Sequence, residues 1–179
     1  MQLKETQKEL EKFAKYVIQQ ARTNLSRKKD NPTSNSTKML YNSLSSKPLS
    51  QGLGVQFSML DYGKFQDQGV KGTKSNYIVN KNSPFSYKKI GSGLKGMPPP
   101  DAFAGWAKRK GIKGRDAKTG RFITDKSLQF LIARSVFQKG IRASMFFTKP
   151  FEAAFERLPE DLQEKFGIDL ENLILKEDG

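Results

Sequence analysis

The stretch that decides the fold class covers residues 52–69 and has the sequence GLGVQFSMLDYGKFQDQG. In its first half two sets of residues alternate, with Leu53, Val55, Phe57 and Met59 on one side and Gly54, Gln56, Ser58 and Leu60 on the other. A period of two residues is typical of a strand with one buried face. In the second half Tyr62, Phe65 and Gln66 follow helical spacing, and Gly69 is a stop signal. The stretch therefore predicts a strand followed directly by a short helix that closes onto the sheet.

Helical patterns flank this strand on both sides. Residues 3–25 carry apolar side chains at three- and four-residue spacing, namely Leu3, Leu10, Phe13, Ala14, Val17, Ile18, Ala21 and Leu25. This amphipathic pattern predicts a long N-terminal helix. After the turn-forming run DNPTSNST, the segment KMLYNSLSSK at residues 38–47 predicts one or two helical turns.

The C-terminal third predicts further helices. An apolar stripe over residues 128–137 indicates a helix that ends near Gly140. Thr148 and Pro150 suit the cap and first turn of a last helical region, with a break at Pro159. We therefore expect a single α+β domain over residues 1–179, in which a small antiparallel β-sheet packs against a long N-terminal helix and C-terminal helices.

The middle of the chain departs from these patterns. Residues 71–122 form a basic segment rich in glycine and lysine, which predicts a long loop insertion. Within it, Asp101 follows three prolines and is expected to cap a helix that carries Phe103 and Trp106. The next part, KRKGIKGRDAKTGRF at residues 108–122, has seven basic residues among three glycines, and its DAKTG predicts a tight reverse turn.

Charge and composition limit the classes of function. The chain has 32 Lys and Arg against 18 Asp and Glu, a net charge of +14, yet residues 150–175 form an acidic helical region. The sequence contains no Cys and no His, which excludes thiolate chemistry, Ser-His-Asp triads and Cys- or His-ligated metals. The acidic residues near the basic segment are widely spaced, so we expect no enzyme activity, no metal and no cofactor.

Targeting signals are also missing from the sequence. No apolar run reaches the roughly 18–20 residues that a membrane helix needs. The N-terminal MQLKETQKELEKFAKYVIQQ has no apolar core of a signal peptide. We therefore expect a protein made in a cytoplasm that does not enter a membrane.

Two segments resemble a known family. QFSMLDYGKFQDQGVKG is similar to the strand and YAxYxExG segment of tail-completion, or head–tail joining (neck or connector), proteins of tailed bacteriophages. Tyr62, Phe65 and Gly69 occupy the matching positions. GIRASMFFTKPFEAAFERL looks like the RPFLxPAxE element that leads into the last helix of that family; the likeness is carried by Phe146, Phe147, Pro150, Phe151, Ala154 and Glu156.

The resemblance implies a non-enzymatic structural virion protein that forms a homo-oligomeric ring at the head–tail junction. It would be assembled in the host cytoplasm, would join portal and adaptor proteins to the tail, and would let genomic DNA pass through its lumen during ejection. The matching residues that it implies for assembly contacts are Tyr62, Phe65, Gly69, Phe146, Phe147, Pro150 and Phe151. We expect some basic residues of the middle segment to face the lumen or a neighbouring protein. The candidates are Lys108, Arg109, Lys110, Lys113, Arg115, Lys118 and Arg121.

The same basic segment leaves an alternative open. Lys and Arg side chains near phosphates give salt-sensitive affinity that does not depend on base sequence. Tyr77, Phe85, Tyr87, Trp106 and Phe122 lie among these charges and would permit base stacking. The alternative function is therefore a nucleic-acid-binding protein without sequence specificity, which contacts the phosphate backbone.

Overall fold

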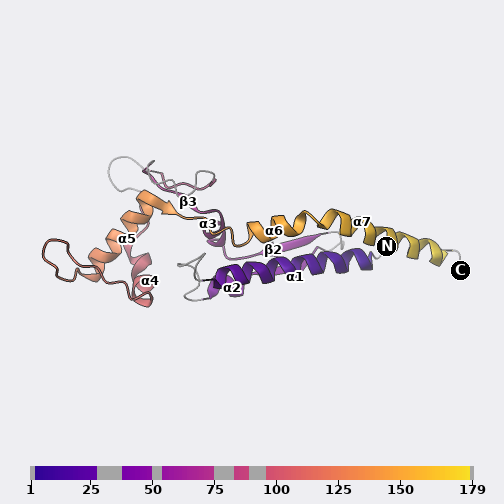
Figure 1. The fold of residues 1–179 in the computed structure, drawn as a ribbon, viewed down its shortest axis with the longest axis horizontal. Coiled ribbons are helices and arrows are strands. Elements are labelled where there is room, and N and C mark those ends of the chain that lie inside the picture. Colours follow the sequence, from indigo (N-terminus) through magenta and orange to yellow (C-terminus); the bar gives the residue numbers. More distant parts are fainter. Residues whose placement is uncertain (1–2, 28–37, 50–53, 75–82, 89–95, 178–179) are drawn as a thin grey trace. The chain divides into compact units, whose positions relative to one another are not determined.

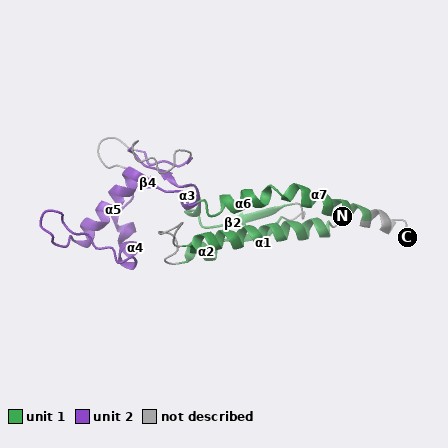
Figure 2. Ribbon diagram, viewed as in Figure 1, with its two compact units in different colours: residues 1–63, 145–179 green, residues 64–144 purple. Residues whose placement is uncertain are grey.

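The computed structural model describes residues 3–27, 38–49, 54–74, 83–88 and 96–177. These residues divide into two compact units, one made of residues 1–63 and 145–179 and the other of residues 64–144 (Figure 2). We call them unit 1 and unit 2. The single domain expected over residues 1–179 stays a prediction, because two compact units can still unfold cooperatively.

Unit 1 combines helices with one β-hairpin. Its elements are α1 (Lys4–Ser26), α2 (Met39–Ser43), β1 (Ser45–Pro48), β2 (Val55–Ser58), α6 (Thr148–Phe155) and α7 (Leu158–Glu177). The strands β1 and β2 pair antiparallel, with Ser46 opposite Phe57. Figure 1 shows α6 and α7 running along α1 in this unit, and α1 contacts both helices and both strands. The expected α+β fold, with a small antiparallel sheet against N- and C-terminal helices, is confirmed.

The core of unit 1 follows the apolar stripe of α1. Leu10, Ala14, Val17, Ile18, Ala21 and Leu25 are all buried on the helix face predicted from their spacing. Leu40, Leu44 and Phe146 pack against the C-terminal half of this stripe. Alternation in β2 is also confirmed, because Val55 and Phe57 are partly buried whereas Gln56 and Ser58 are exposed.

Unit 2 is built around one helix. Its elements are α3 (Gly63–Gln68, which starts at the unit boundary), β3 (Val70–Lys71), the 3-10 turn η1 (Pro100–Phe103), α4 (Ala104–Arg109), α5 (Asp125–Lys139) and β4 (Gly140–Ile141). The short strands β3 and β4 pair antiparallel, with Val70 opposite Ile141. Helix α5 packs against η1 and α4, and buries Ala133 and Phe137. The short helix expected around Phe65 and the helix expected over residues 128–137 are thus confirmed.

Two local expectations are corrected. Asp101 does not cap a helix, because the chain already enters a 3-10 turn at Pro100 with Pro99 in the cap position. Thr148 is the first residue of α6 rather than its cap, which is Phe147. The observed side-chain cap is instead Thr124, whose hydroxyl accepts a hydrogen bond from the Ser127 N–H at the start of α5.

The basic segment 71–122 is not a loop throughout. Its described parts contain η1, α4 and a bridge between Lys71 and Ser86, and its last part forms a hairpin. Tyr77 and the other residues of 75–82 and 89–95 lie outside the described residues. The last helical region is interrupted as expected, but the break lies before Pro159: α6 ends at Phe155, and Pro159 is the second residue of α7.

Candidate functional site

The whole net charge of the chain resides in unit 2. Residues 64–144 contain 18 Lys and Arg against four Asp and Glu, whereas unit 1 contains 14 of each. Unit 2 therefore carries +14 and unit 1 is formally neutral. A concentration of one sign on one unit favours a polyanionic or acidic partner for that unit.

The seven predicted basic residues fall into two groups within unit 2. Lys108, Arg109 and Lys110 lie at the C-terminal end of α4, where cations interact favourably with the helix dipole. The second group lies on the hairpin that follows; its members are Lys113, Arg115, Lys118 and Arg121. All seven are exposed, as a charged contact surface requires.

The second group lies on residues 113–123, which we call the basic hairpin. Arg115 and Phe122 pair as an antiparallel bridge. The Asp116 N–H donates to the Arg121 carbonyl at 2.9 Å, and the Ile123 N–H donates to the Gly114 carbonyl at 3.0 Å. These backbone bonds confirm the tight reverse turn that DAKTG predicts, and they hold the four cations on an ordered backbone.

Asp116 organises the turn of this hairpin. Its carboxylate accepts hydrogen bonds from the N–H groups of Thr119 at 2.8 Å and Lys118 at 2.9 Å, and from the Thr119 hydroxyl at 3.1 Å. The Thr119 N–H is the main cause that lowers the pKa of Asp116, followed by the Thr119 hydroxyl and the Lys118 N–H. The carboxylate of Asp116, the one acidic residue of the hairpin, thus stabilises the backbone of the turn.

An aromatic ring completes the hairpin. Phe122 is 60% exposed, and the guanidinium carbon of Arg115 lies 4.2 Å from its ring centroid. The ammonium of Lys113 lies 5.9 Å from the same centroid. Cations over a ring face are attracted by its quadrupole, which restrains both side chains. The sequence contains the signal for this arrangement, because residues equidistant from a turn lie opposite each other in a hairpin.

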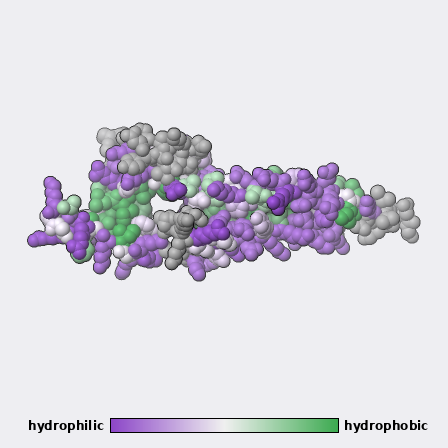
Figure 3. Space-filling view, in the orientation of Figure 1, coloured by the Kyte–Doolittle hydropathy of each residue, from purple (hydrophilic) through white to green (hydrophobic). Residues whose placement is uncertain are grey.

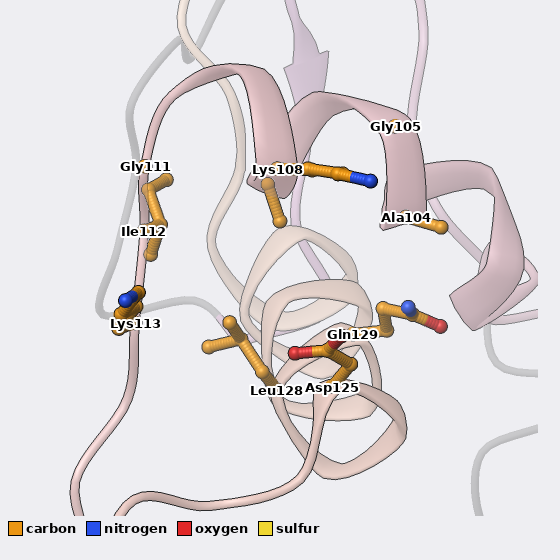
Figure 4. Close-up of a pocket in the computed structure, with 10 residues that line it drawn as sticks. Ala104, Gly105, Lys108, Gly111, Ile112, Lys113, Asp125, Leu128 and Gln129 are labelled. Carbon is orange, nitrogen blue, oxygen red and sulfur yellow. The ribbon is translucent and has the colours of Figure 1, made fainter.

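A groove lies beside the hairpin, between α4 and the start of α5 (Figure 4). Its volume is about 430 Å³. Apolar atoms of Ala107, Ile112 and Leu128 line it, and Lys108, Lys113 and Asp125 supply charges. The groove is thus a continuation of the basic surface rather than a pocket with converging catalytic groups.

Of the three family-like residues near position 65, two lie at the surface and Gly69 is buried. Tyr62 and Phe65 are exposed, and the Phe65 ring contacts Phe85 edge-on, with centroids 4.7 Å apart. Gly69 ends α3 with φ of +70°, a backbone conformation that side chains disfavour. Tyr62 and Phe65 are thus accessible for the assembly contacts that the resemblance implies, whereas Gly69 is buried against the backbone of Ile141 and is not.

Two of the four family-like residues near position 150 lie in the core of unit 1, where they do not fit the assembly contacts expected of them; the contacts expected of Phe147 and Phe151 stay a prediction. Phe146 is 1% exposed and Pro150 is also buried, so neither side chain is accessible to a partner. Phe147 and Phe151 are partly buried and join Phe13 and Phe57 in a cluster of rings with centroids 5.4–6.1 Å apart. The second motif therefore builds the fold.

Neither a metal site nor a membrane span is found in the described part of the chain. Within residues 3–27, 38–49, 54–74, 83–88 and 96–177, no three acidic side chains gather closely enough to hold a metal ion. No helix among the same residues combines the length and the hydropathy that crossing a bilayer requires.

Compared with known proteins, the chain matches no protein-family model, no curated protein and no solved structure.

Proposed function

We propose that this chain is a structural, non-enzymatic protein of a tailed-phage virion. Copies of it would form a ring at the head–tail junction, where they contact portal or adaptor proteins and tail proteins and surround the passing DNA. The order of the two motifs supports this proposal: the strand and tyrosine–glycine segment comes first, and the FFTKPFEAAF segment leads into the last helices.

The observation that carries the proposal is the separation of charge between two surfaces. Unit 2 is strongly basic, whereas residues 152–179 have nine acidic and three basic side chains. Each surface also exposes apolar side chains: Figure 3 shows an apolar area over α5, where Phe130 and Leu131 are exposed, and Phe155 and Phe166 are exposed in the acidic region. Different but complementary patches on one chain favour head-to-tail contacts, which form a ring when the rotation between neighbouring copies closes.

The test measures the molar mass of the purified protein by light scattering at low and moderate salt. We expect one closed oligomer whose mass does not change with protein concentration. Heterologous contacts predict a further result with two variants. Glu160→Gln/Glu164→Gln/Glu171→Gln disables the acidic surface, and Lys126→Gln/Arg134→Gln disables the α5 surface. Each alone should be monomeric, and their mixture should form only a one-to-one dimer.

A concentration-independent monomer that binds DNA tightly would overturn this proposal. It would favour the alternative, a free nucleic-acid-binding protein without sequence specificity. The observation that favours the alternative is the exposed basic hairpin with its aromatic ring. Light scattering separates the two functions, because only the ring requires self-association.

A further inference from the structure

We propose that the basic hairpin, residues 113–123, is the element that contacts duplex DNA, and that it does so through the phosphate backbone. The inference rests on the proposed function in one respect, because that function brings DNA to the protein. It goes further by assigning the contact to one hairpin among the basic segments of unit 2.

Positive charge is concentrated on the basic hairpin. The hairpin carries Lys113, Arg115, Lys118 and Arg121 on 11 residues, and its one acidic residue is Asp116. The carboxylate of Asp116 accepts hydrogen bonds from backbone N–H groups of the turn. Duplex DNA carries one negative charge per about 1.7 Å of its axis, so several cations on a short hairpin can neutralise neighbouring phosphates.

The backbone of the basic hairpin is ordered by hydrogen bonds between its two strands. Cross-strand bonds join Asp116 to Arg121 and Gly114 to Ile123, and the Gly120 N–H donates to the Asp116 carbonyl at 2.9 Å. A segment already in its bound conformation loses less entropy when it binds. The hairpin therefore presents its cations at a lower ordering cost than a flexible lysine-rich loop would.

The side chains of the basic hairpin indicate which part of DNA it contacts. Arg115 lies over Phe122, and its guanidinium donates a hydrogen bond to the Gly120 carbonyl at 3.2 Å. The hairpin contains no Asn or Gln, the residues that recognise adenine in the major groove. Lys and Arg side chains can also contact guanine, but roughly half to two-thirds of protein–DNA hydrogen bonds go to phosphate and sugar. We therefore assign these cations to phosphates and expect a contact that does not depend on base sequence.

The experiment measures the affinity of the full chain for a fluorescent duplex of mixed sequence as a function of salt. The test variant is Lys113→Gln/Lys118→Gln/Arg121→Gln, which spares Arg115 and the hydrogen bonds of the turn. The matched control is Lys74→Gln/Lys88→Gln/Arg142→Gln, three exposed cations of unit 2 that lie outside both the hairpin and the α5 surface. Both variants lose three positive charges.

We expect the slope of log K against log salt to become shallower by about 0.9 for each phosphate contact removed, hence by up to about 2.7 in the hairpin variant. Its affinity at about 0.1 M salt should fall at least tenfold. The control variant should keep a slope close to that of the unmodified protein. Equal losses in the two variants would overturn the proposal, because net charge alone would then account for binding.

An unmodified protein that binds no duplex at low salt would also overturn it. Light scattering on the same samples separates this failure from that of the proposed function. A hairpin variant that stays oligomeric but loses DNA supports both proposals. A hairpin variant that loses its oligomeric mass and keeps DNA affinity assigns the hairpin to an acidic surface of a second copy instead.

Discussion

Asp169, in the middle of α7, caps the first turn of α1 at Thr6. Its carboxylate accepts hydrogen bonds from the Thr6 N–H at 2.9 Å, the Thr6 hydroxyl at 2.8 Å and the Glu5 N–H at 3.1 Å. The residue in the cap position of α1 itself is Leu3, whose side chain cannot accept a hydrogen bond. The free N–H groups at the start of α1 are thus satisfied from the other end of the sequence, which connects the two long helices of unit 1.

Replacing this cap should destabilise unit 1. Asp169 is 5% exposed, so Asp169→Ala leaves N–H groups of α1 without their partner. We expect a loss of about 1–2 kcal/mol in the free energy of unfolding, as for other N-cap removals. Urea denaturation followed by circular dichroism measures it. Glu171→Ala, at an exposed position on the same helix, is the control and should change stability by less than about 0.5 kcal/mol.

The same carboxylate predicts a pH dependence. Burial alone would raise the pKa of Asp169, but the hydrogen bonds from Thr6 and Glu5, with the charge of Lys8, outweigh it and lower that pKa. A lowered folded-state pKa stabilises the fold above the unfolded value of about 3.9, and this contribution disappears as pH falls through the folded value. The stability difference between the unmodified protein and Asp169→Asn should therefore be constant from about pH 6 to 8 and shrink below about pH 4. A difference that grows in acid would contradict the assignment.

Phe146 should behave as a core residue rather than an assembly contact. Its ring packs among Leu25, Leu40 and Leu44, so Phe146→Ala creates a cavity in unit 1. We expect a loss of about 3–5 kcal/mol in the free energy of unfolding, measured by urea denaturation. Phe166→Ala, at a residue 41% exposed, should cost less than about 1 kcal/mol. A stable Phe146→Ala variant with impaired self-association would restore the assembly role.

Alanine substitutions at Gly69 and Gly120 test whether the close packing of Gly69 against the backbone of Ile141 requires a glycine. Their φ angles are +70° and +69°, so alanine is strained to the same degree at both. A Cβ at Gly69 would lie 2.6 Å from the Ile141 carbonyl oxygen, whereas a Cβ at Gly120 would meet no atom within 4 Å. We expect Gly120→Ala to cost about 1 kcal/mol and Gly69→Ala roughly 2–4 kcal/mol. Similar losses in thermal and urea unfolding would show that the Ile141 contact relaxes easily.

Two substitutions of Asp116 distinguish the effect of the hairpin's charge on DNA binding from the effect of its ordered turn. Asp116→Asn removes a negative charge but keeps an acceptor for the Lys118 and Thr119 N–H groups, so affinity for duplex DNA should rise severalfold. Asp116→Ala removes the same charge and also the acceptor, so its affinity should be lower than that of Asp116→Asn. Fluorescence anisotropy at fixed salt compares the two variants. Equal affinities would show that the order of the turn does not contribute to DNA binding.

Local sequence patterns determined the helices, the second strand and the turn. The apolar spacing of residues 3–25 predicts α1 because one stripe of a helix must face the core, and Val55 and Phe57 predict the buried face of β2 for the same reason. Gly69, Gly140 and DAKTG mark their ends and turns through backbone preferences that need no partner. The excess of positive charge in the middle of the chain is likewise a property of the sequence alone.

Only the tertiary structure decided which side chains become partners. Nothing local to α1 predicts that Asp169 caps it, because that contact joins residues 163 positions apart. The strand β1 and the β3–β4 pair were not predicted, since their few residues become strands only through the segments opposite them. Phe146 belongs to the core rather than to a contact surface because α1 and α2 cover it. Sequence pattern specifies where an apolar or charged side chain occurs along an element, and packing then determines whether that side chain meets the core, another helix or solvent.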